Sequence, residues 1–386
     1  MEHQVSSSEL SPEASAGDPI KVVLDNGSDT TKAGLAGDST PKVICRTVVG
    51  RPRRKGLKVF KNQGNFVGKE ALSKRGILAL SSPIDQGHIV NWDDMETIWH
   101  HIFDKELSIS PDEHPLLLTE SPLNPKADGE KMAQIMFETF NIPALYVANS
   151  AVLSLFADGR TTGTVLKSGR SVTHAVPIVD GSVITDAITR TEVAGRDVTD
   201  YLMSLLNNRG YSFTTEADRL VADDIKEKLC YVALDLNQEL HSAAEFSTLH
   251  KSYTLSDGSV MNLSDERCRC IELMFDPSLL GYVTEGLSQM VHNAISRCKE
   301  ETWKSLYNNI VLAGGATLYK GLHDRLRAEI VTLAPAEMKV KVIAPEDRKY
   351  SAWLGGSILA NLPSFKDKWV SKQEYDEVGP SIVNRK

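Results

Sequence analysis

Two stretches of the chain share one pattern, an apolar strand that enters a short polar turn. They are residues 21–29 (KVVLDNGSD) and residues 164–174 (TVLKSGRSVTH), and the second continues into an outgoing strand. Paired hairpins of this kind, one in each half of a duplicated α/β protein, close on nucleotide phosphates from two sides, because their turns present backbone N–H groups. An acid in each hairpin normally holds a metal ion through water. The first hairpin has Asp25 at that place and the second has Lys167.

The size and charge of the chain exclude several classes of protein. Its 386 residues are enough for two domains with a large core. The net charge of −8 argues against general nucleic-acid binding. No apolar run approaches the ~20 residues that span a bilayer, and the N-terminus is polar rather than signal-like. Five cysteines form no even disulfide framework, which indicates reduced thiols in a cytosolic or nuclear protein.

Two segments differ in composition from the rest. Residues 1–18 are rich in Ser, Glu and Pro, which predicts a disordered tail, and the folded part is expected to begin at residue 19. Residues 51–61 (RPRRKGLKVFK) carry six basic side chains around one glycine, which predicts an exposed loop. That loop is either a solvated turn or a partner-binding segment.

The remainder alternates between strands and helices. Asn91 precedes apolar residues at helical spacing, from Met95 to Phe103, with acids in the first turn. Further strands and helices are expected in turn at residues 116–120, 131–140, 145–148 and 151–157. This alternation predicts an α/β fold with mostly parallel sheets. After a strand at residues 309–313, Gly314-Gly315 is a place where backbone can approach a ligand closely.

Ten blocks of sequence carry a resemblance to a known family. They are DNGS at 25–28, NWDDM at 91–95, LLTE at 117–120, LNPKA at 123–127, QIMFETFN at 134–141, AGRD at 194–197, DIKEKLCYVALD at 224–235, RKYS at 348–351, GGSILA at 355–360 and KQEYDE at 372–377. The blocks stand in the order found in actins. From about residue 19 to its C-terminus the chain therefore resembles the actin family.

The resemblance implies the actin-like ATPase fold, in which two duplicated α/β domains enclose a nucleotide cleft. The smaller domain is expected at residues 19–157 plus 351–386, with an inserted outer lobe near 47–82. The larger is expected at residues 158–350, with its outer lobe near 194–282. ATP or ADP would sit at the cleft floor, with its phosphates between the two hairpins.

The resemblance also assigns roles to individual residues. Ser150 and His174 match positions that orient the attacking water, and Asp25 matches a metal anchor whose partner is replaced by Lys167. Nucleotide contacts fall on Ser28, Asp29, Lys32, Ser168, Gly169, Arg170, Gly195, Asp197, Lys226, Glu227, Gly314, Gly315, Tyr319 and Lys349.

Several of these positions depart from the family pattern. Lys167 and Arg170 replace two aspartates, which is expected to weaken the binding of Mg²⁺ or Ca²⁺, because hard cations prefer carboxylate oxygen. Asp29 replaces a glycine and either turns to solvent or pairs with Arg170 or Lys167 across the cleft. Alternatively the two cations contact phosphates directly. Ser150 replaces a glutamine and is too short to orient water, which predicts weak or no hydrolysis.

The nucleoside side of the pocket is also altered. Asp223 replaces an arginine and Ala316 a threonine. A cleft that still admits adenine nucleotide is favoured, and an empty, salt-bridged cleft is the alternative.

Three functions follow from the resemblance. The first is an actin-like cytoskeletal protein in the cytoplasm that assembles with conventional actin or like subunits and binds actin-binding proteins. The second is a non-polymerising actin-related subunit of a larger complex, with the nucleus as its location. The third is an active ATPase of the actin type or of the related sugar-kinase and chaperone superfamily. Myosin is a weak expectation as a partner, because the acidic cluster that engages it in actin is missing from residues 2–18.

Overall fold

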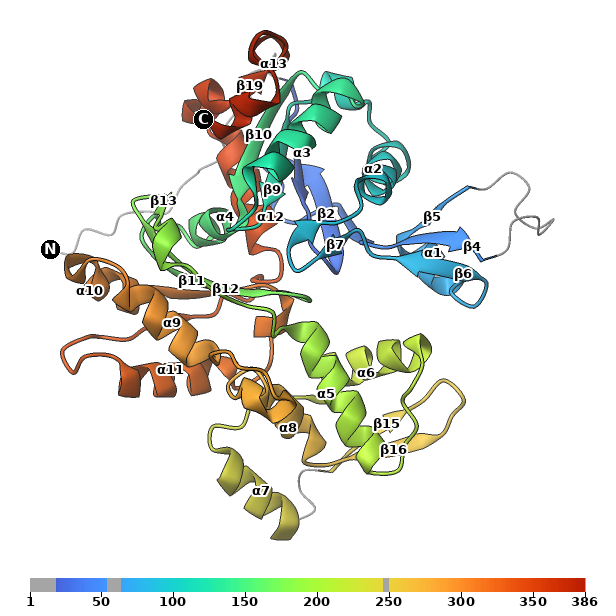
Figure 1. The fold of residues 1–386 in the computed structure, drawn as a ribbon, viewed down its shortest axis with the longest axis vertical. Helices are drawn as coiled ribbons and strands as arrows, with labels where there is room; N and C mark the ends of the chain where they lie inside the picture. The colour runs from blue at the N-terminus through green and yellow to red at the C-terminus, as the bar shows by residue number, and fades with distance from the viewer. Residues whose placement is uncertain (1–18, 54–63, 246–249, 386) are drawn as a thin grey trace, which may run out of the picture.

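The computed structural model describes residues 19–53, 64–245 and 250–385. The tail expected at residues 1–18 and the part of the basic loop from 54 to 61 lie outside the described residues. Two large mixed sheets occupy adjoining halves of the molecule (Figure 1). The structure and its element order fit an α/β fold, as the alternation of strands and helices predicts.

The first sheet contains the first of the two hairpins. β1 runs antiparallel to its hairpin partner β2 and parallel to β9. Across the sheet the strands are β19 (Val370–Ser371), β10 (Ala144–Asn149), β9 (Leu116–Glu120), β1 (Val22–Asp25), β2 (Thr30–Leu35) and β3 (Val43–Arg46).

The second sheet contains the second hairpin in the same arrangement. β11 runs antiparallel to β12 and parallel to β17. Its strands are β13 (Ser182–Val183), β12 (Thr173–Val179), β11 (Gly163–Ser168), β17 (Ile310–Ala313) and β18 (Val342–Ile343), with β14 (Thr189–Thr191) paired to β12. The expectation of mostly parallel sheets is wrong. A tight turn joins antiparallel neighbours, so each hairpin adds antiparallel pairs beside the parallel ones.

Three smaller sheets among the described residues lie outside these two. The sheet of β4, β5 and β6 projects to one side of the first half (Figure 1). The basic segment at 51–61 was expected to be a loop throughout, but Arg51 and Pro52 are the last residues of β4, where they pair with β6. The strands are β4 (Val49–Pro52), β5 (Phe66–Val67), β6 (Leu78–Ser81), β7 (Ile84–Asp85), β8 (His88–Ile89), β15 (Lys251–Thr254) and β16 (Val260–Leu263).

Helices cover the two large sheets. The helix expected after Asn91 is confirmed, because the Asn91 side chain caps it by accepting from the Asp94 N–H at 3.0 Å. The helices of the first half are α1 (Gly68–Ser73), α2 (Trp92–His101), α3 (Lys126–Glu138) and α4 (Ser150–Ala157). The others are α5 (Gly195–Asn208), α6 (Glu216–Leu229), α7 (Leu236–Glu245), α8 (Glu266–Glu272), α9 (Leu287–Ser296), α10 (Glu300–Asn308), α11 (Leu322–Leu333), α12 (Ser351–Asn361) and α13 (Lys372–Val378). None of the helices within the described ranges is long and apolar enough to cross a membrane.

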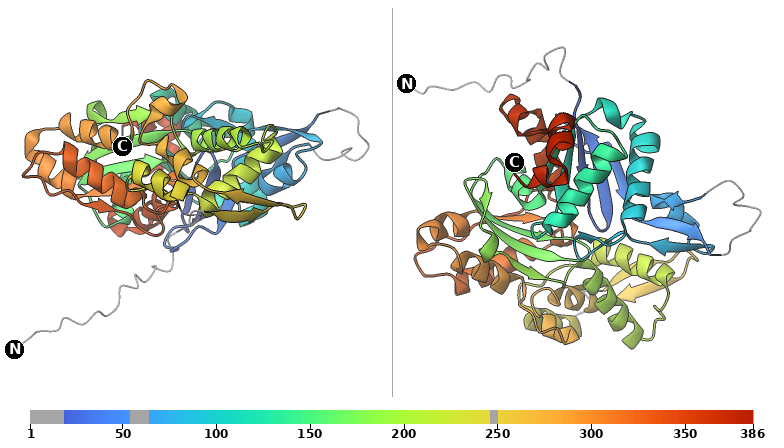
Figure 2. Two further views of the ribbon diagram at one scale, coloured as in Figure 1. Left: turned by 90° about the horizontal axis from the view of Figure 1, so that it is seen from below. Right: turned by 45° about the horizontal axis from the view of Figure 1, so that its top comes forward.

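The C-terminal segment returns to the first sheet, against which it packs (Figure 2). The Trp353 indole is fully buried and donates to the Val23 carbonyl at 3.0 Å. α12 also packs closely on α4, and Gly355 makes that approach possible. A Cβ at Gly355 would lie 1.9 Å from the Leu153 carbonyl oxygen, well inside van der Waals contact. α4 and α12 thereby join the two halves beneath the hairpins.

Candidate functional site

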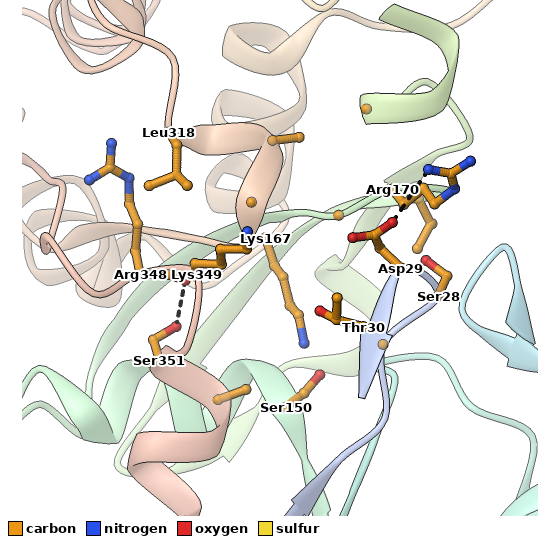
Figure 3. A pocket seen from close by; sticks show the side chains of 18 of the residues that line it. Ser28, Asp29, Thr30, Ser150, Lys167, Arg170, Leu318, Arg348, Lys349 and Ser351 are labelled. Atoms are coloured by element: carbon orange, nitrogen blue, oxygen red, sulfur yellow. Dashed lines mark hydrogen bonds and ion pairs between the residues drawn. The ribbon is translucent and has the colours of Figure 1, made fainter. Parts of the chain in front are cut away.

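The turns of the two hairpins face each other across a cavity of about 440 Å³ (Figure 3). β1 and β11 each run parallel to a neighbour, β9 and β17, so their carboxyl ends meet at one edge of each sheet. In α/β folds, ligands bind outside the carboxyl ends of such strands. The cavity therefore lies where the sequence pattern places the nucleotide.

Most of the predicted site residues line this cavity. They are Asp25, Ser28, Asp29, Lys32, Ser150, Lys167, Gly169, Arg170, His174, Gly195, Lys226, Glu227, Gly314, Gly315, Tyr319 and Lys349. Of the predicted residues that the structure describes, Ser168 and Asp197 lie outside this lining. The Ser168 hydroxyl hydrogen-bonds that of Thr173 at 2.7 Å, and Asp197 accepts from the Ala194 N–H at 3.0 Å and caps α5. Both therefore shape the wall rather than face the cavity.

Gly314 and Gly315 bring bare backbone to the cavity. Gly314 has φ of +87°, and a Cβ there would lie 2.3 Å from the Ser168 carbonyl oxygen. No other residue type adopts this conformation and tolerates this contact at little cost. Apart from the residues next to it in the chain, no atom of the described residues lies within 4 Å of a Cβ built at Gly315. Gly314 therefore lets the chain pass close to Ser168, and the two glycines leave this part of the cavity wall without side chains, so that a ligand can approach the backbone.

The carboxylate of Asp25 is already engaged on both oxygens. Lys32 Nζ lies 2.9 Å from Oδ2, and the Thr119 hydroxyl donates to Oδ1 at 2.8 Å. Burial opposes ionisation, but the charges of Lys32 and Lys167 and these hydrogen bonds outweigh it and lower the pKa of Asp25. Asp25 is therefore an ionised carboxylate held by a lysine.

Lys167 extends from β11 into the centre of the cavity (Figure 3). Burial lowers the pKa of Lys167 to about 8, with the nearby Lys32 adding to this and Asp25 opposing it. Burial and the positive charges of Lys167 and Arg190 also lower the pKa of His174 to about 3. At neutral pH His174 is uncharged, whereas most Lys167 side chains carry a proton.

These residues do not fit a divalent cation. Asp25 is the only carboxylate contributed by the two predicted anchor positions, and both of its oxygens have partners. Lys167 brings a positive charge where a second acid would be needed, and Mg²⁺ and Ca²⁺ prefer several carboxylate or carbonyl oxygens. Within residues 19–53, 64–245 and 250–385, no group of three or more His, Cys, Asp or Glu side chains is placed to hold a metal ion.

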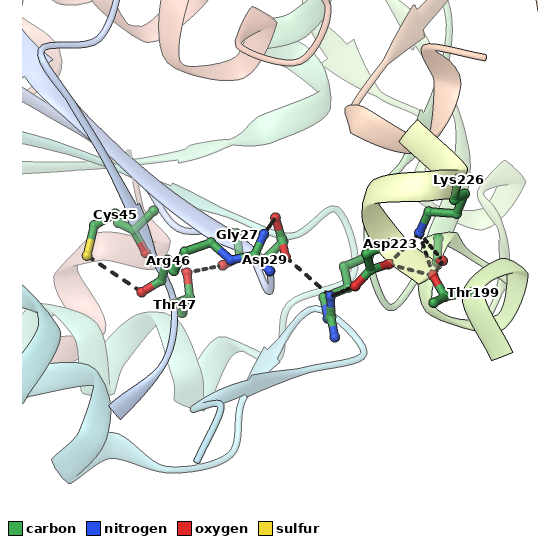
Figure 4. A network of polar contacts seen from close by, with 11 residues as sticks. Gly27, Asp29, Cys45, Arg46, Thr47, Thr199, Asp223 and Lys226 are labelled. Atoms are coloured by element: carbon green, nitrogen blue, oxygen red, sulfur yellow. Dashed lines mark hydrogen bonds and ion pairs between the residues drawn. The ribbon is translucent and has the colours of Figure 1, made fainter. Parts of the chain in front are cut away.

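A chain of ion pairs joins the two hairpins at one side of the cavity (Figure 4). Arg46 lies 2.7 Å from one oxygen of Asp29, and Arg170 lies 3.4 Å from the other. Arg170 also lies 3.4 Å from Asp223, which pairs with Lys226 at 2.8 Å. The predicted pairing of Asp29 with Arg170 is confirmed, and the alternative that Asp29 turns freely to solvent is wrong.

Arg46 was missed by the sequence reasoning. It stands at the end of β3, opposite Thr30 in β2, and a single basic residue in a strand carries no recognisable pattern. Asp223 was noted only as a substitution. Its spacing of three from Lys226 on a helix is a signal that identifies an ion pair, because residues i and i+3 are neighbours on a helix surface.

Ser150 is the first residue of α4, which Asn149 caps by accepting from the Ala151 N–H at 2.9 Å. Its side chain is 2% exposed and faces the cavity. Within the described part of the chain its hydroxyl has no hydrogen-bond partner. The hydroxyl therefore has unused hydrogen-bonding capacity, but it is buried and extends only one atom beyond Cβ.

Replacing Lys167 with Met is expected to raise the melting temperature at pH 7 by about 2 °C. The folded state disfavours the charged form of Lys167, so this group lowers stability fully below its folded pKa of about 8. The penalty fades as the pH rises towards the ordinary value of 10.5. Thermal unfolding of both proteins at pH 7 and pH 10 tests this, and a melting-temperature difference that is unchanged between the two would contradict it.

The comparison with known families covers nearly the whole chain. A model of the family described as Actin matches residues 17–386. The match includes both hairpins, the Gly314-Gly315 wall and the α4–α12 contact. This chain belongs to the actin family.

Proposed function

We propose that this protein is an actin-like cytoskeletal subunit that binds adenine nucleotide weakly, hydrolyses ATP slowly and assembles with or onto actin filaments. Family membership supports the general role, and the 440 Å³ cavity with its glycine-lined wall supports a nucleotide ligand. The Arg170–Asp29 ion pair supports weak binding. A polyphosphate has to accommodate the Asp29 carboxylate or disrupt this pair to enter.

Different residues would contact the phosphates and the nucleoside. The N–H groups of the turns at Ser28 and Gly169, with the Lys32 ammonium, would hold phosphate oxygens. Glu227, Tyr319 and Lys349 line the same cavity and would contact the nucleoside. A bound triphosphate supplies the bond that hydrolysis breaks.

The proposal of slow hydrolysis rests on the residues of the cavity wall that would face the phosphates. Phosphoryl transfer depends on positioning, so a group must hold the attacking water in line. Ser150 presents a hydroxyl too short for this task, and burial, which lowers the pKa of His174 to about 3, makes its imidazole a poor proton acceptor. A steady-state phosphate-release assay on the polymerised protein tests this part of the proposal.

An exposed apolar segment supports assembly. It comprises residues 277–283, which include the 3₁₀ turn Pro277–Leu280. Leu279 and Leu280 are 42% and 39% exposed, and Tyr282 and Val283 are also exposed. Such a cluster of large apolar side chains is typical of a protein interface.

Replacing Leu279 and Leu280 together with Asp is expected to raise the critical concentration for assembly about tenfold or more. Each leucine that becomes buried contributes roughly 1.5–3 kcal/mol, and ~1.4 kcal/mol is a factor of ten. Co-sedimentation with conventional actin measures the effect. Val331→Asp is the matched control, because Val331 is 53% exposed on α11 and does not belong to this segment. Equal pelleting of all three proteins would show that residues 277–283 are not an interface.

The same experiments distinguish the proposed function from two other functions. A non-polymerising subunit of a larger complex, located in the nucleus, would stay in the supernatant with and without actin. An active ATPase would release phosphate at the rate of conventional actin. We place the protein in the cytoplasm with the cytoskeleton, and imaging of the tagged full chain beside stained filaments tests that location.

A further inference from the structure

One charged group at the centre of the cleft lacks a partner among the described residues. Lys167 Nζ extends into the cavity, and no acceptor among the residues that the structure describes lies within hydrogen-bond or ion-pair distance of it. Lys32, by contrast, is paired with Asp25 at 2.9 Å. The unused donors of this ammonium face the cavity, where acceptor oxygens of a ligand would form charge-assisted hydrogen bonds with them.

The position of Lys167 is fixed by the pairing of its strand with both neighbouring strands. It lies in β11 opposite His174 of β12 on one side and Ala313 of β17 on the other. Both neighbouring strands are buried, so the base of the side chain is fixed within the sheet. The ammonium is therefore held beside the turn at Gly169 and close to the Asp25–Lys32 pair.

The charges of the cleft favour an anion without a metal ion. Among the hairpin residues and their ion-pair partners, five cations (Lys32, Arg46, Lys167, Arg170 and Lys226) face three carboxylates (Asp25, Asp29 and Asp223). A divalent cation near Asp25 would meet the repulsion of Lys167, whereas phosphate oxygens would accept from it in a charge-assisted hydrogen bond.

We propose that the Lys167 ammonium takes the place of the divalent cation, so that the cleft binds metal-free ATP or ADP. This inference rests on the proposed nucleotide binding and defines its ligand. The positive charge that neutralises the phosphates belongs to the protein itself, and it is present before the ligand enters. The metal complex of ATP carries less negative charge than free ATP and adds a cation that Lys167 repels, so it should bind less tightly.

Isothermal titration calorimetry of the full chain with ATP tests this, once with Mg²⁺ in excess and once with EDTA. The unmodified protein is expected to bind ATP in EDTA at least as tightly as in Mg²⁺. Lys167→Met removes the charge at similar length and should weaken binding in EDTA about tenfold or more. Lys167→Asp should reverse the preference, so that binding is detectable with Mg²⁺ and lost with EDTA.

Lys320→Met is the matched control, because Lys320 also lines the cavity but is exposed at its rim. The affinity of the Lys320→Met variant for ATP should differ less than threefold from that of the unmodified protein, both with Mg²⁺ and with EDTA. Thermal unfolding of each variant shows whether it is folded, and the comparison on the unmodified protein needs no variant at all.

The outcomes separate this inference from the proposed function. If the unmodified protein loses more than tenfold in affinity on chelation, a metal ion is required and the inference fails, although nucleotide binding stands. If Lys167→Met binds ATP in EDTA as tightly as the unmodified protein, the inference fails in the same way. If the unmodified protein binds ATP in neither condition, both the inference and the proposed nucleotide binding are overturned.

Discussion

Phosphate release by the unmodified protein is expected to be about a hundredfold slower than by a variant with Ser150→Gln, Lys167→Asp, Arg170→Asp and Asp29→Gly. Ser150→Gln supplies a side chain long enough to hold water in line, and Lys167→Asp removes the ammonium from the cavity. Asp29→Gly is included because Arg170→Asp alone would leave two carboxylates facing each other, where an ion pair now stands at 3.4 Å. Steady-state release with Mg²⁺ present measures the rate.

Ser150→Gln alone is the informative single variant. Groups that act as one unit give non-additive effects, so this change should recover only a small part of the rate. Arg46→Gln tests the contribution of the Asp29 ion pair separately, because Arg46 pairs with Asp29 from β3 and lines the same cavity. If the unmodified protein already releases phosphate as fast as the variant with all four substitutions, the residues present in the cleft support hydrolysis and the slow-hydrolysis proposal is wrong.

Gly355→Ala is expected to destabilise the fold by about 3 kcal/mol or more. The new Cβ would lie 1.9 Å from the Leu153 carbonyl oxygen, and backbone atoms cannot yield as a flexible side chain can. α4 and α12 would have to separate, although Trp353 anchors α12 to the first sheet. Urea unfolding measures the change.

The same substitution is expected to weaken ATP binding as well. α4 begins at Ser150 and α12 begins at Ser351, and both residues line the cavity. Gly76→Ala is the matched control, because, apart from its chain neighbours, no atom of the described residues lies within 4 Å of a Cβ built there, and its effect should stay within about 0.5 kcal/mol. Equal unfolding midpoints for Gly355→Ala and Gly76→Ala would show that the helix contact can relax.

The local elements followed from the sequence because their causes are local. Asn91 directly precedes α2 and caps it by accepting from the N–H of Asp94, three residues further on. The apolar runs ending at Asp25 and Ser168 are strands of the two hairpins. The resemblance to actins placed most of the site residues, and those residues line one cavity. The mixed character of the sheets was missed, because the alternation of strands and helices indicates parallel crossovers but not how many hairpin strands join them.

The charge partners in the cleft were decided by the tertiary structure. The sequence shows Asp29 and Arg170 as substituted positions, but they stand 141 residues apart, and their pairing depends on how the two sheets face each other. Asp25 is held by Thr119 from the neighbouring parallel strand, 94 residues away. Whether Lys167 meets a carboxylate or open space likewise depends on the distance between hairpins. Sequence by itself therefore determined the family, the elements and the charges present, whereas the packing of the two halves determined which charges are neutralised and which one remains for a ligand.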